Sequence, residues 1–231
     1  MPPSSAHGWF VTGTDTGVGK TRAAVAMLHR LRADGLRAVG MKPVASGCEH
    51  TEAGWRNEDA LALQAASDPR PDYALVNPYA LPRATAPQLA ADDAGVRVAL
   101  PRLIDAARAL QAQADVLVVE GAGGWLAPMD HGLDQSDLAR ALGLPVLLVV
   151  GVRLGCLSHA RLSARAIAAD GLSFAGWIAN RIDPGFEDAQ AYLALLADAL
   201  PAPCLGVLPW AEAPDPAELV AALRAPGAAA A

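Results

Sequence analysis

The sequence predicts an α/β fold in which helices cover both faces of a mostly parallel central sheet. Short apolar segments alternate with amphipathic segments along the chain, as strands and helices do around a parallel sheet. The short segments are apolar at consecutive positions, which is typical of strands buried on both faces. Apolar residues make up 53% of the 231 residues, enough to supply such a core.

The expected strands and helices follow one another in a regular order. The segments with the pattern of a buried strand are 9–12, 38–41, 116–119, 146–150, 174–179 and 204–207. The segments with helical periodicity are 21–34, 59–66, 100–114, 157–169 and 187–199. Right-handed crossovers between parallel strands bring their carboxyl ends to one edge of the sheet, where ligands bind.

Residues 43–100 are the irregular part of the chain. Apart from the helix at 59–66 they show few periodic runs, and they contain Pro69, Pro71, Pro78, Pro82 and Pro87. A long insertion of low regularity is often a substrate-binding segment, but it is also compatible with a surface excursion that carries no chemistry. The pattern does not separate these two interpretations.

Length and composition favour one domain spanning residues 1–231, with frayed ends at about 1–7 and 225–231. The net charge of −6 argues against binding to nucleic acid or to an anionic membrane surface. The longest apolar runs are too short to span a bilayer, and the start MPPSSAHGW does not resemble a signal peptide. Cys48, Cys156 and Cys204 have neither disulfide nor zinc spacing, which favours reduced thiols and a cytoplasmic location.

The loop that follows the first strand, GTDTGVGKT, has the pattern of a phosphate-binding loop. Its glycines allow successive backbone N–H groups to turn onto phosphate oxygens, and the next helix adds its positive end. Lys20 is expected at the β- and γ-phosphates, and the Thr21 hydroxyl at Mg²⁺. The first glycine is Gly13, one residue earlier than in the strict pattern. The nucleotide-binding residues expected here are Gly13, Thr14, Asp15, Thr16, Gly17, Val18, Gly19, Lys20 and Thr21.

Two further strands end in charged side chains. Lys42 follows the second strand, in MKPVASG, so its ammonium is expected beside the phosphate loop together with the Ser46 hydroxyl. Glu120 ends the third strand, in VLVVEGAGGW, where a carboxylate can hold magnesium. The alternative for Lys42 is a solvated lysine at the strand end, and the alternative for Glu120 is a structural glutamate with a buried partner.

The sequence leaves the roles of two other polar residues open. Asp59 is either a second magnesium carboxylate or, like Asn57, a cap of the helix at 59–66, and spacing alone favours the cap. Asn180 ends the fifth strand, where its amide suits either the edge of adenine or the capping of the turn at 181–185.

Taken together, these motifs resemble the dethiobiotin synthetase family. The resemblance extends from Phe10 to about Trp210 and is carried by GTDTGVGKT, KPVASG, RNEDALAL, NPY, VEGAGGW, VVGVRLGCLSHA, AGWIAN and LPW. It implies the P-loop NTPase fold, a homodimer, ATP as cosubstrate and Mg²⁺ as cofactor. It also implies that 7,8-diaminononanoate, CO2 and ATP give dethiobiotin, ADP and phosphate, through a carbamate and a carbamic-phosphoric anhydride.

The resemblance also implies a role for individual residues. The magnesium ligands would be Thr21, Asp59 and Glu120, and the catalytic residues would be Lys42, Lys20, Thr16 and Ser46. Beyond the loop, the residues near the nucleotide would be Asp59, Glu120, Gly121, Gly123, Asn180 and Pro209. The substrate residues would be Lys42, Ser46, Gly123, Gly124, Gly155, Cys156, Leu157, Ser158 and, from the second subunit, Tyr192.

The chain departs from the family pattern at three positions. Gly17 stands where many relatives carry an acidic residue, and Arg153 and Ser158 stand where lysine and asparagine are familiar. Arginine keeps the charge of lysine, whereas serine is shorter than asparagine and weakens the expected contact with the substrate carboxylate.

Three other functions share the predicted fold or cofactor. A regulatory ATPase of the cell-division type carries a signature lysine where this chain has Asp15, and that charge is wrong for the role. An amidotransferase would need a glutaminase domain for which 231 residues leave no room. A metabolite kinase would release a phosphorylated product and no free phosphate.

Overall fold

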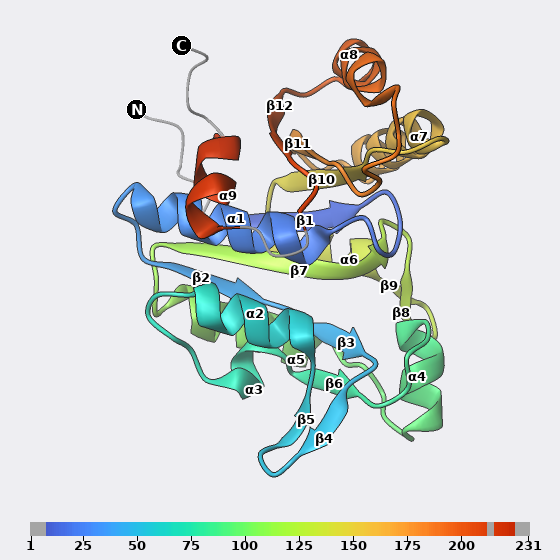
Figure 1. Cartoon of the computed structure of the whole chain (residues 1–231). Helices are drawn as coiled ribbons and strands as arrows, with labels where there is room; N and C mark the ends of the chain where they lie inside the picture. Colours follow the sequence, from blue (N-terminus) through green and yellow to red (C-terminus); the bar gives the residue numbers. More distant parts are fainter. Residues whose placement is uncertain (1–7, 212–214, 225–231) are drawn as a thin grey trace.

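A six-stranded parallel sheet forms the centre of the molecule (Figure 1). The computed structural model describes residues 8–211 and 215–224. The strand order is β12-β11-β10-β1-β7-β2, and all five pairings are parallel, so every carboxyl end lies at the same edge. The six strands are the six segments that the sequence predicts, with the bounds β1 (Gly8–Gly13), β2 (Ala38–Met41), β7 (Val116–Gly124), β10 (Val146–Gly151), β11 (Phe174–Asn180) and β12 (Cys204–Leu208).

Helices cover both faces of this sheet, which confirms the three-layer α/β/α prediction. The five predicted helices are present, with the bounds α1 (Lys20–Ala33), α2 (Glu58–Ala66), α5 (Leu100–Gln111), α7 (Cys156–Ala169) and α8 (Ala189–Ala199). The chain also forms α3 (Tyr73–Val76), α4 (Pro87–Asp93), α6 (Gln135–Leu142) and α9 (Pro216–Ala222), which the sequence analysis did not predict. In Figure 1, α1, α2 and α9 lie on the near side of the sheet and α5 and α6 on the far side.

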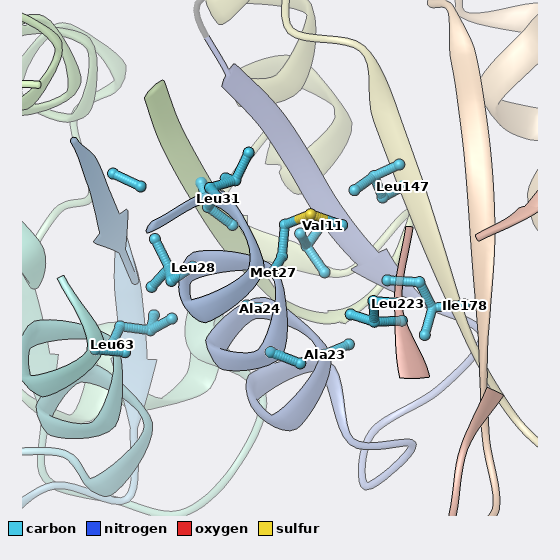
Figure 2. Close-up of a cluster of buried hydrophobic side chains, with 14 of the residues drawn as sticks. Val11, Ala23, Ala24, Met27, Leu28, Leu31, Leu63, Leu147, Ile178 and Leu223 are labelled. Atoms are coloured by element: carbon cyan, nitrogen blue, oxygen red, sulfur yellow. The ribbon is translucent and has the colours of Figure 1, made fainter. Parts of the chain in front are cut away.

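Consecutive strand residues pack into different layers of the core. Val11 contributes to the cluster under α1 and α2, whereas its neighbour Phe10 contributes to the cluster under α5 and α6. Figure 2 shows the first cluster, where Met27 of α1 meets Val11 and Leu147 from the sheet. Helix α1 presents apolar residues at 23, 24, 27, 28 and 31, the spacing of one helix face. Burial on both faces explains why the strands are apolar throughout.

The irregular segment after β2 folds into small elements near the carboxyl edge of the sheet. β3 (Val44–Ser46) pairs with β6 (Tyr79–Leu81), and β4 (Glu49–Thr51) forms a hairpin with β5 (Gly54–Arg56) that projects from the body in Figure 1. A further pair, β8 (Pro128–Asp130) and β9 (Leu133–Asp134), follows β7 and packs against α4. These short pieces lack a hydrophobic period of their own, so the sequence did not predict them.

A single domain over 1–231 remains a prediction, and the expected fraying at 1–7 and 225–231 falls outside the described residues. None of the helices in the described part of the chain has the length and apolar character needed to cross a membrane.

Candidate active site

The phosphate-binding loop connects β1 to α1 at the carboxyl edge of the sheet. Gly19 directly precedes α1 with a φ of 85°, a left-handed conformation that glycine adopts readily. A Cβ atom at Gly19 would lie 2.0 Å from Nδ2 of Asn180, so the position has no room for a side chain. The local geometry therefore requires glycine before Lys20, as the loop pattern predicts.

Asp15 accepts hydrogen bonds from two groups of this loop. Its carboxylate accepts the backbone N–H of Thr16 at 2.7 Å, and its carbonyl oxygen accepts the ammonium of Lys20 at 2.9 Å. Its second carboxylate oxygen pairs with Arg153, which precedes α7, at 2.7 Å. Asp15 therefore contacts two donors that the sequence assigns to phosphate, and Arg153 links the loop to the start of α7.

Lys20 and Lys42 are both buried beside this loop, and they are the only lysines of the 231-residue sequence. Burial, with the nearby positive charge of Lys42, lowers the pKa of Lys20 to about 8. An anionic ligand at the loop would oppose this effect because it stabilises the ammonium form.

The strand-end side chains converge on one charged cluster. Lys42 pairs through Nζ with Oε1 of Glu120 at 2.6 Å and with Oδ2 of Asp59 at 2.9 Å. The hydroxyl of Thr21 donates to the same Glu120 oxygen at 2.8 Å. Lys42 and Glu120 are buried. Lys42 is therefore not a solvated lysine at a strand end.

The protonation of this cluster reflects competition between burial and ion pairing. Burial lowers the pKa of Lys42, but the carboxylates of Glu120 and Asp59 outweigh it and hold the pKa above its usual value. Burial raises the pKa of Glu120, and repulsion by Asp59 adds to this, while Lys42 opposes both. For Asp59, Lys42 outweighs burial and lowers the pKa of the carboxyl group.

The two interpretations of Asp59 are separated by the geometry of α2. The side chain of Asn57 accepts the N–H of Ala60 at 3.2 Å and so caps the helix. Asp59, in the first turn, points its carboxylate at Lys42 instead. The cap that spacing favoured for Asp59 is therefore wrong, because Asn57 already performs that role.

A cavity of about 860 Å³ is lined by the charged cluster and by the part of the loop from Thr16 onward, without Val18. This volume is in the range of small-molecule sites. The sequence-predicted residues that line the cavity are Thr16, Gly17, Gly19, Lys20, Thr21, Lys42, Ser46, Asp59, Glu120, Gly123 and Gly124. The lining residues that sequence reasoning missed are Arg22, Val44, Ala45, Asn57, Ala84, Thr85, Ala86, Pro87, Ala122, Ala127 and Pro128.

Most of these missed residues are small or apolar. Val44, Ala45, Asn57 and Ala122 lie within quoted motifs but were not assigned to the site, and no motif marks residues 84–87, although Pro87 begins α4 at a position that favours proline. Residues 44–46, 57, 59 and 84–87 all belong to the irregular segment after β2. The segment is therefore part of the cavity wall and not a mere surface excursion.

Asn180 lies at the end of β11 and is buried. Its Nδ2 donates to the carbonyl of Val18 at 3.0 Å, and its Oδ1 is buried without a partner. The turn after β11 is capped by Asp183, whose carboxylate accepts the N–H of Gly185 at 2.9 Å. Capping of that turn by Asn180 is therefore wrong, whereas the adenine contact stays a prediction.

Several predicted residues lie away from the cavity within this chain. Gly155 precedes α7, Cys156–Ser158 form its first turn, and Tyr192 lies on α8. Tyr192 packs edge-to-face on Phe186 with ring centroids 4.9 Å apart. Pro209 is exposed after β12, and Gly121 lies next to the lining residues. One chain thus brings together the phosphate and strand-end residues but not the α7 and α8 residues.

The described residues contain oxygen ligands but no cluster typical of a protein-only metal site. Within 8–211 and 215–224, no three His, Cys, Asp or Glu side chains come together as metal ligands. The cluster instead combines Thr21, Asp59 and Glu120, and Oε2 of Glu120 is buried without a partner. Two carboxylates, a hydroxyl and phosphate oxygens are ligands that suit Mg²⁺ bound with a nucleotide.

Comparison with known proteins identifies the family of the chain. The sequence matches the AAA domain family over residues 7–218. The ATP-dependent dethiobiotin synthetase BioD of Xanthomonas euvesicatoria pv. vesicatoria is 62% identical over 218 residues, covering 94% of this chain and 97% of that protein. The protein of the same name from Xylella fastidiosa is 59% identical over 224 residues, covering 96% of this chain and 99% of that protein.

Solved structures with low sequence identity share the fold. The signal recognition particle receptor FtsY of Elizabethkingia anophelis aligns with a TM-score of 0.56 at 17% identity, over 94% of this chain and 65% of that chain. The MinC:MinD cell division complex of Aquifex aeolicus aligns with a TM-score of 0.55 at 15% identity, over 93% of this chain and 85% of the other. These similarities support the P-loop NTPase fold alone. The high identity to curated relatives over nearly the whole length shows that the chain belongs to the ATP-dependent dethiobiotin synthetase family of enzymes.

Proposed function

We propose that this protein closes the ureido ring of dethiobiotin from 7,8-diaminononanoate and CO2, with ATP converted to ADP and phosphate. The observation that carries the proposal is the placement of Lys42, Glu120, Asp59 and Thr21 beside the phosphate loop in one cavity. The names of the relatives support the use of ATP and the formation of dethiobiotin. The protein would work as one domain in the cytoplasm.

The proposed cofactor is Mg²⁺, held by Thr21, Asp59, Glu120 and the phosphate oxygens. The unpartnered Oε2 of Glu120 supports this assignment, since buried polar atoms in folded proteins almost always have a partner, and a bound cation would supply one. When bound by these residues, Mg²⁺ would supply positive charge that offsets the negative charge of the phosphates.

The proposed reaction has three steps. One amine of the diamine adds to CO2 and loses a proton, which gives a carbamate. A carbamate oxygen then attacks the γ-phosphorus, and the bond to the bridging oxygen of ADP breaks. Finally the second amine attacks the carbonyl carbon and expels phosphate with loss of a proton, which leaves the cyclic urea.

The residues of the cavity would act by position and charge. The ammonium of Lys42 would lie between the carbamate and the γ-phosphoryl group. Both groups are negatively charged, so the ammonium would reduce the repulsion between them. Lys20 would hold the phosphates, while Thr16 and Ser46 would donate hydrogen bonds to phosphate or substrate oxygens. The backbone of Gly123 and Gly124 would approach the carbamate end.

The proposed active form is a homodimer. Gly155, Cys156, Leu157, Ser158 and Tyr192 lie outside the cavity of their own chain, so a role at the substrate carboxylate needs a second subunit. The N–H groups at the start of α7 and the Tyr192 hydroxyl would bind that carboxylate. Asn180 and the backbone near Pro209 would contact adenine.

Phosphate release tests the proposed function. Purified protein is incubated with MgATP and bicarbonate, with and without 7,8-diaminononanoate, and the product mass is determined. We expect release that depends on the diamine and a product heavier than the diamine by one carbonyl less two hydrogens. Release that ignores the diamine, or a phosphorylated product without free phosphate, would refute the proposal.

A further inference from the structure

Strand β7 contains a bulge beside the phosphate loop. Val11 of β1 pairs with Glu120, and Gly13 pairs with Gly124, so residues 121–123 stand opposite Thr12 alone. Gly123 within this bulge has a φ of 64°. Bulges of this kind bend a strand and change the direction of its side chains. The bulge thus connects Glu120 of the charged cluster to the glycines that line the cavity.

Gln135, the first residue of α6, fills the space beneath the bulge. Its side chain is fully buried, and its Nε2 donates to Oγ1 of Thr12 at 3.2 Å and to the carbonyl of Gly124 at 3.1 Å. Since a carbonyl only accepts, the atom facing Gly124 is the amide nitrogen. A Cβ at Gly121 would lie 2.2 Å from Oε1 of Gln135, so the bulge and the amide fit closely together.

The other half of the amide is not satisfied. Oε1 of Gln135 is buried without a hydrogen-bond donor among the described residues. The small cavity next to it, between Phe10, Gly121 and Leu138, has no space for a water molecule. A buried carbonyl without a donor destabilises a fold and offsets the two hydrogen bonds that the same amide makes, so stability alone does not account for an amide at this position.

We propose that Gln135 is a positioning residue for the reaction. By bonding Thr12 and Gly124 at once, its amide bridges the strand entering the phosphate loop and the far end of the bulge. This bridge fixes Glu120 at one end of the bulge and Gly123 and Gly124 at the other. The inference rests on the proposed function, because it assumes that these groups bind the phosphates and the carbamate.

Methionine in place of Gln135 tests the inference, because it keeps the length of the side chain and removes the amide. We expect Gln135→Met to lower kcat at saturating MgATP and diamine by at least about tenfold, since small displacements of reacting groups strongly reduce the rate. The thermal midpoint should stay near that of the wild type, because the unsatisfied oxygen is lost together with the two hydrogen bonds. Ser136→Ala, the buried neighbour on α6, is the matched control and should leave kcat and Tm unchanged.

A second substitution checks the route through Thr12. Thr12→Val removes the hydroxyl that Nε2 contacts and keeps the shape of the side chain. If the amide acts through the two strands, the double variant Thr12→Val/Gln135→Met should be no slower than Gln135→Met alone. Fully multiplicative losses would overturn the bridge through Thr12. A kcat of Gln135→Met within twofold of the wild type would overturn the whole inference.

A binding measurement separates this inference from the proposed function. The affinity for ATP is measured with Mg²⁺ and with EDTA for wild type and Gln135→Met. Mg²⁺ should raise the affinity for ATP in both proteins. Because Glu120 is displaced in the variant, this gain in affinity should be several-fold smaller there than in the wild type. If wild-type turnover does not depend on the diamine, the proposed function fails, and Gln135 is then judged by this gain alone. An equal gain in both proteins would refute the positioning role.

Discussion

At the scale of single residues, Lys42 pairs with the two carboxylates of the cavity. It is the one cation within hydrogen-bond distance of both Asp59 and Glu120 among the described residues. Its ammonium opposes the effect of burial on Glu120, so removing it would raise the pKa of that carboxyl group further. The sequence predicted both side chains from the ends of two apolar strands, but their pairing was not predicted.

We expect Lys42→Met to lower kcat by at least about a thousandfold while the Kd for ATP changes only a few-fold. The reason is that the charge serves the transferring phosphoryl group more than the bound nucleotide. Phosphate release and calorimetric titration with MgATP measure the two quantities. Arg56→Met, which removes a cation stacked on Tyr73 instead, is the control. Equal losses in kcat and in affinity would show that Lys42 only binds ATP.

Lys20 gives a prediction about pH. Its pKa of about 8 lies below the usual 10.5 because the free cavity disfavours its charge. Bound phosphate favours the ammonium form, so binding must take up a proton above pH 8. The affinity for ATP should therefore be constant below about pH 8 and fall as the pH rises above it, by up to about tenfold per unit.

Calorimetric titrations between pH 7 and 9.5 would measure this dependence. Lys20→Arg is the matched control, because a guanidinium stays charged over the whole range and its profile should be flat. Acetylation at pH 8 gives a second readout, since the sequence has only two lysines. Lys20 should react faster than Lys42 although both are buried. A flat profile for the wild type would contradict the prediction.

At the scale of elements, the start of α2 positions a charged side chain of the cavity. Asn57 caps the helix, which places Asp59 in the first turn with its carboxylate toward Lys42. The sequence RNEDALAL predicted a helix here but left the roles of its polar residues open. The distinction depends on the direction in which α2 meets the sheet, which local sequence does not specify.

Asn57→Ala should destabilise the fold by about 1 kcal/mol, since it removes a cap. It should also lower turnover, because fraying of the first turn moves Asp59 away from Lys42. Asp72→Ala is the matched control, as Asp72 caps α3 in the same way through the N–H of Ala74. We expect similar shifts of Tm in both variants and reduced kcat in Asn57→Ala alone. Equal kcat values would mean that the cap contributes only stability.

The elements that the sequence did not reveal share a physical reason. Helices α4 and α9 span seven residues each and begin with proline, so they show little period and contain a residue that usually interrupts helices. Helix α6 spans eight residues and follows directly from a two-residue strand. Such short elements are stabilised by the surfaces they pack on, which a local pattern does not contain.

At the scale of the whole molecule, the cavity collects residues from segments far apart in the chain. Residues of the phosphate loop, of β7 and of the segment 44–87 line one space because parallel strands end at one edge. Residues 155–158 and Tyr192 do not reach it from the same chain. If they serve the reaction, the site is shared between two subunits.

Mixing inactive variants tests this arrangement. Lys42→Met and Ser158→Trp alter residues of different subunits in the proposed site, so their heterodimer contains one intact site. After random exchange of subunits, activity should return to about a quarter of the wild-type value. Lys42→Met mixed with Lys20→Met is the control, since both residues belong to one subunit and no intact site forms. Absence of recovery in the first mixture would contradict the shared site.

The sequence by itself determined the six strands of the sheet, five of the helices that cover it and the loop with the phosphate-binding pattern. These features follow from local periodicity and from glycines whose conformation the loop requires, so neighbouring residues contain the information. The contacts at the site were decided by tertiary structure. Lys42 meets Asp59 and Glu120, residues 84–87 complete the cavity wall, and Gln135 fills the bulge of β7 only because the fold brings distant segments to one edge.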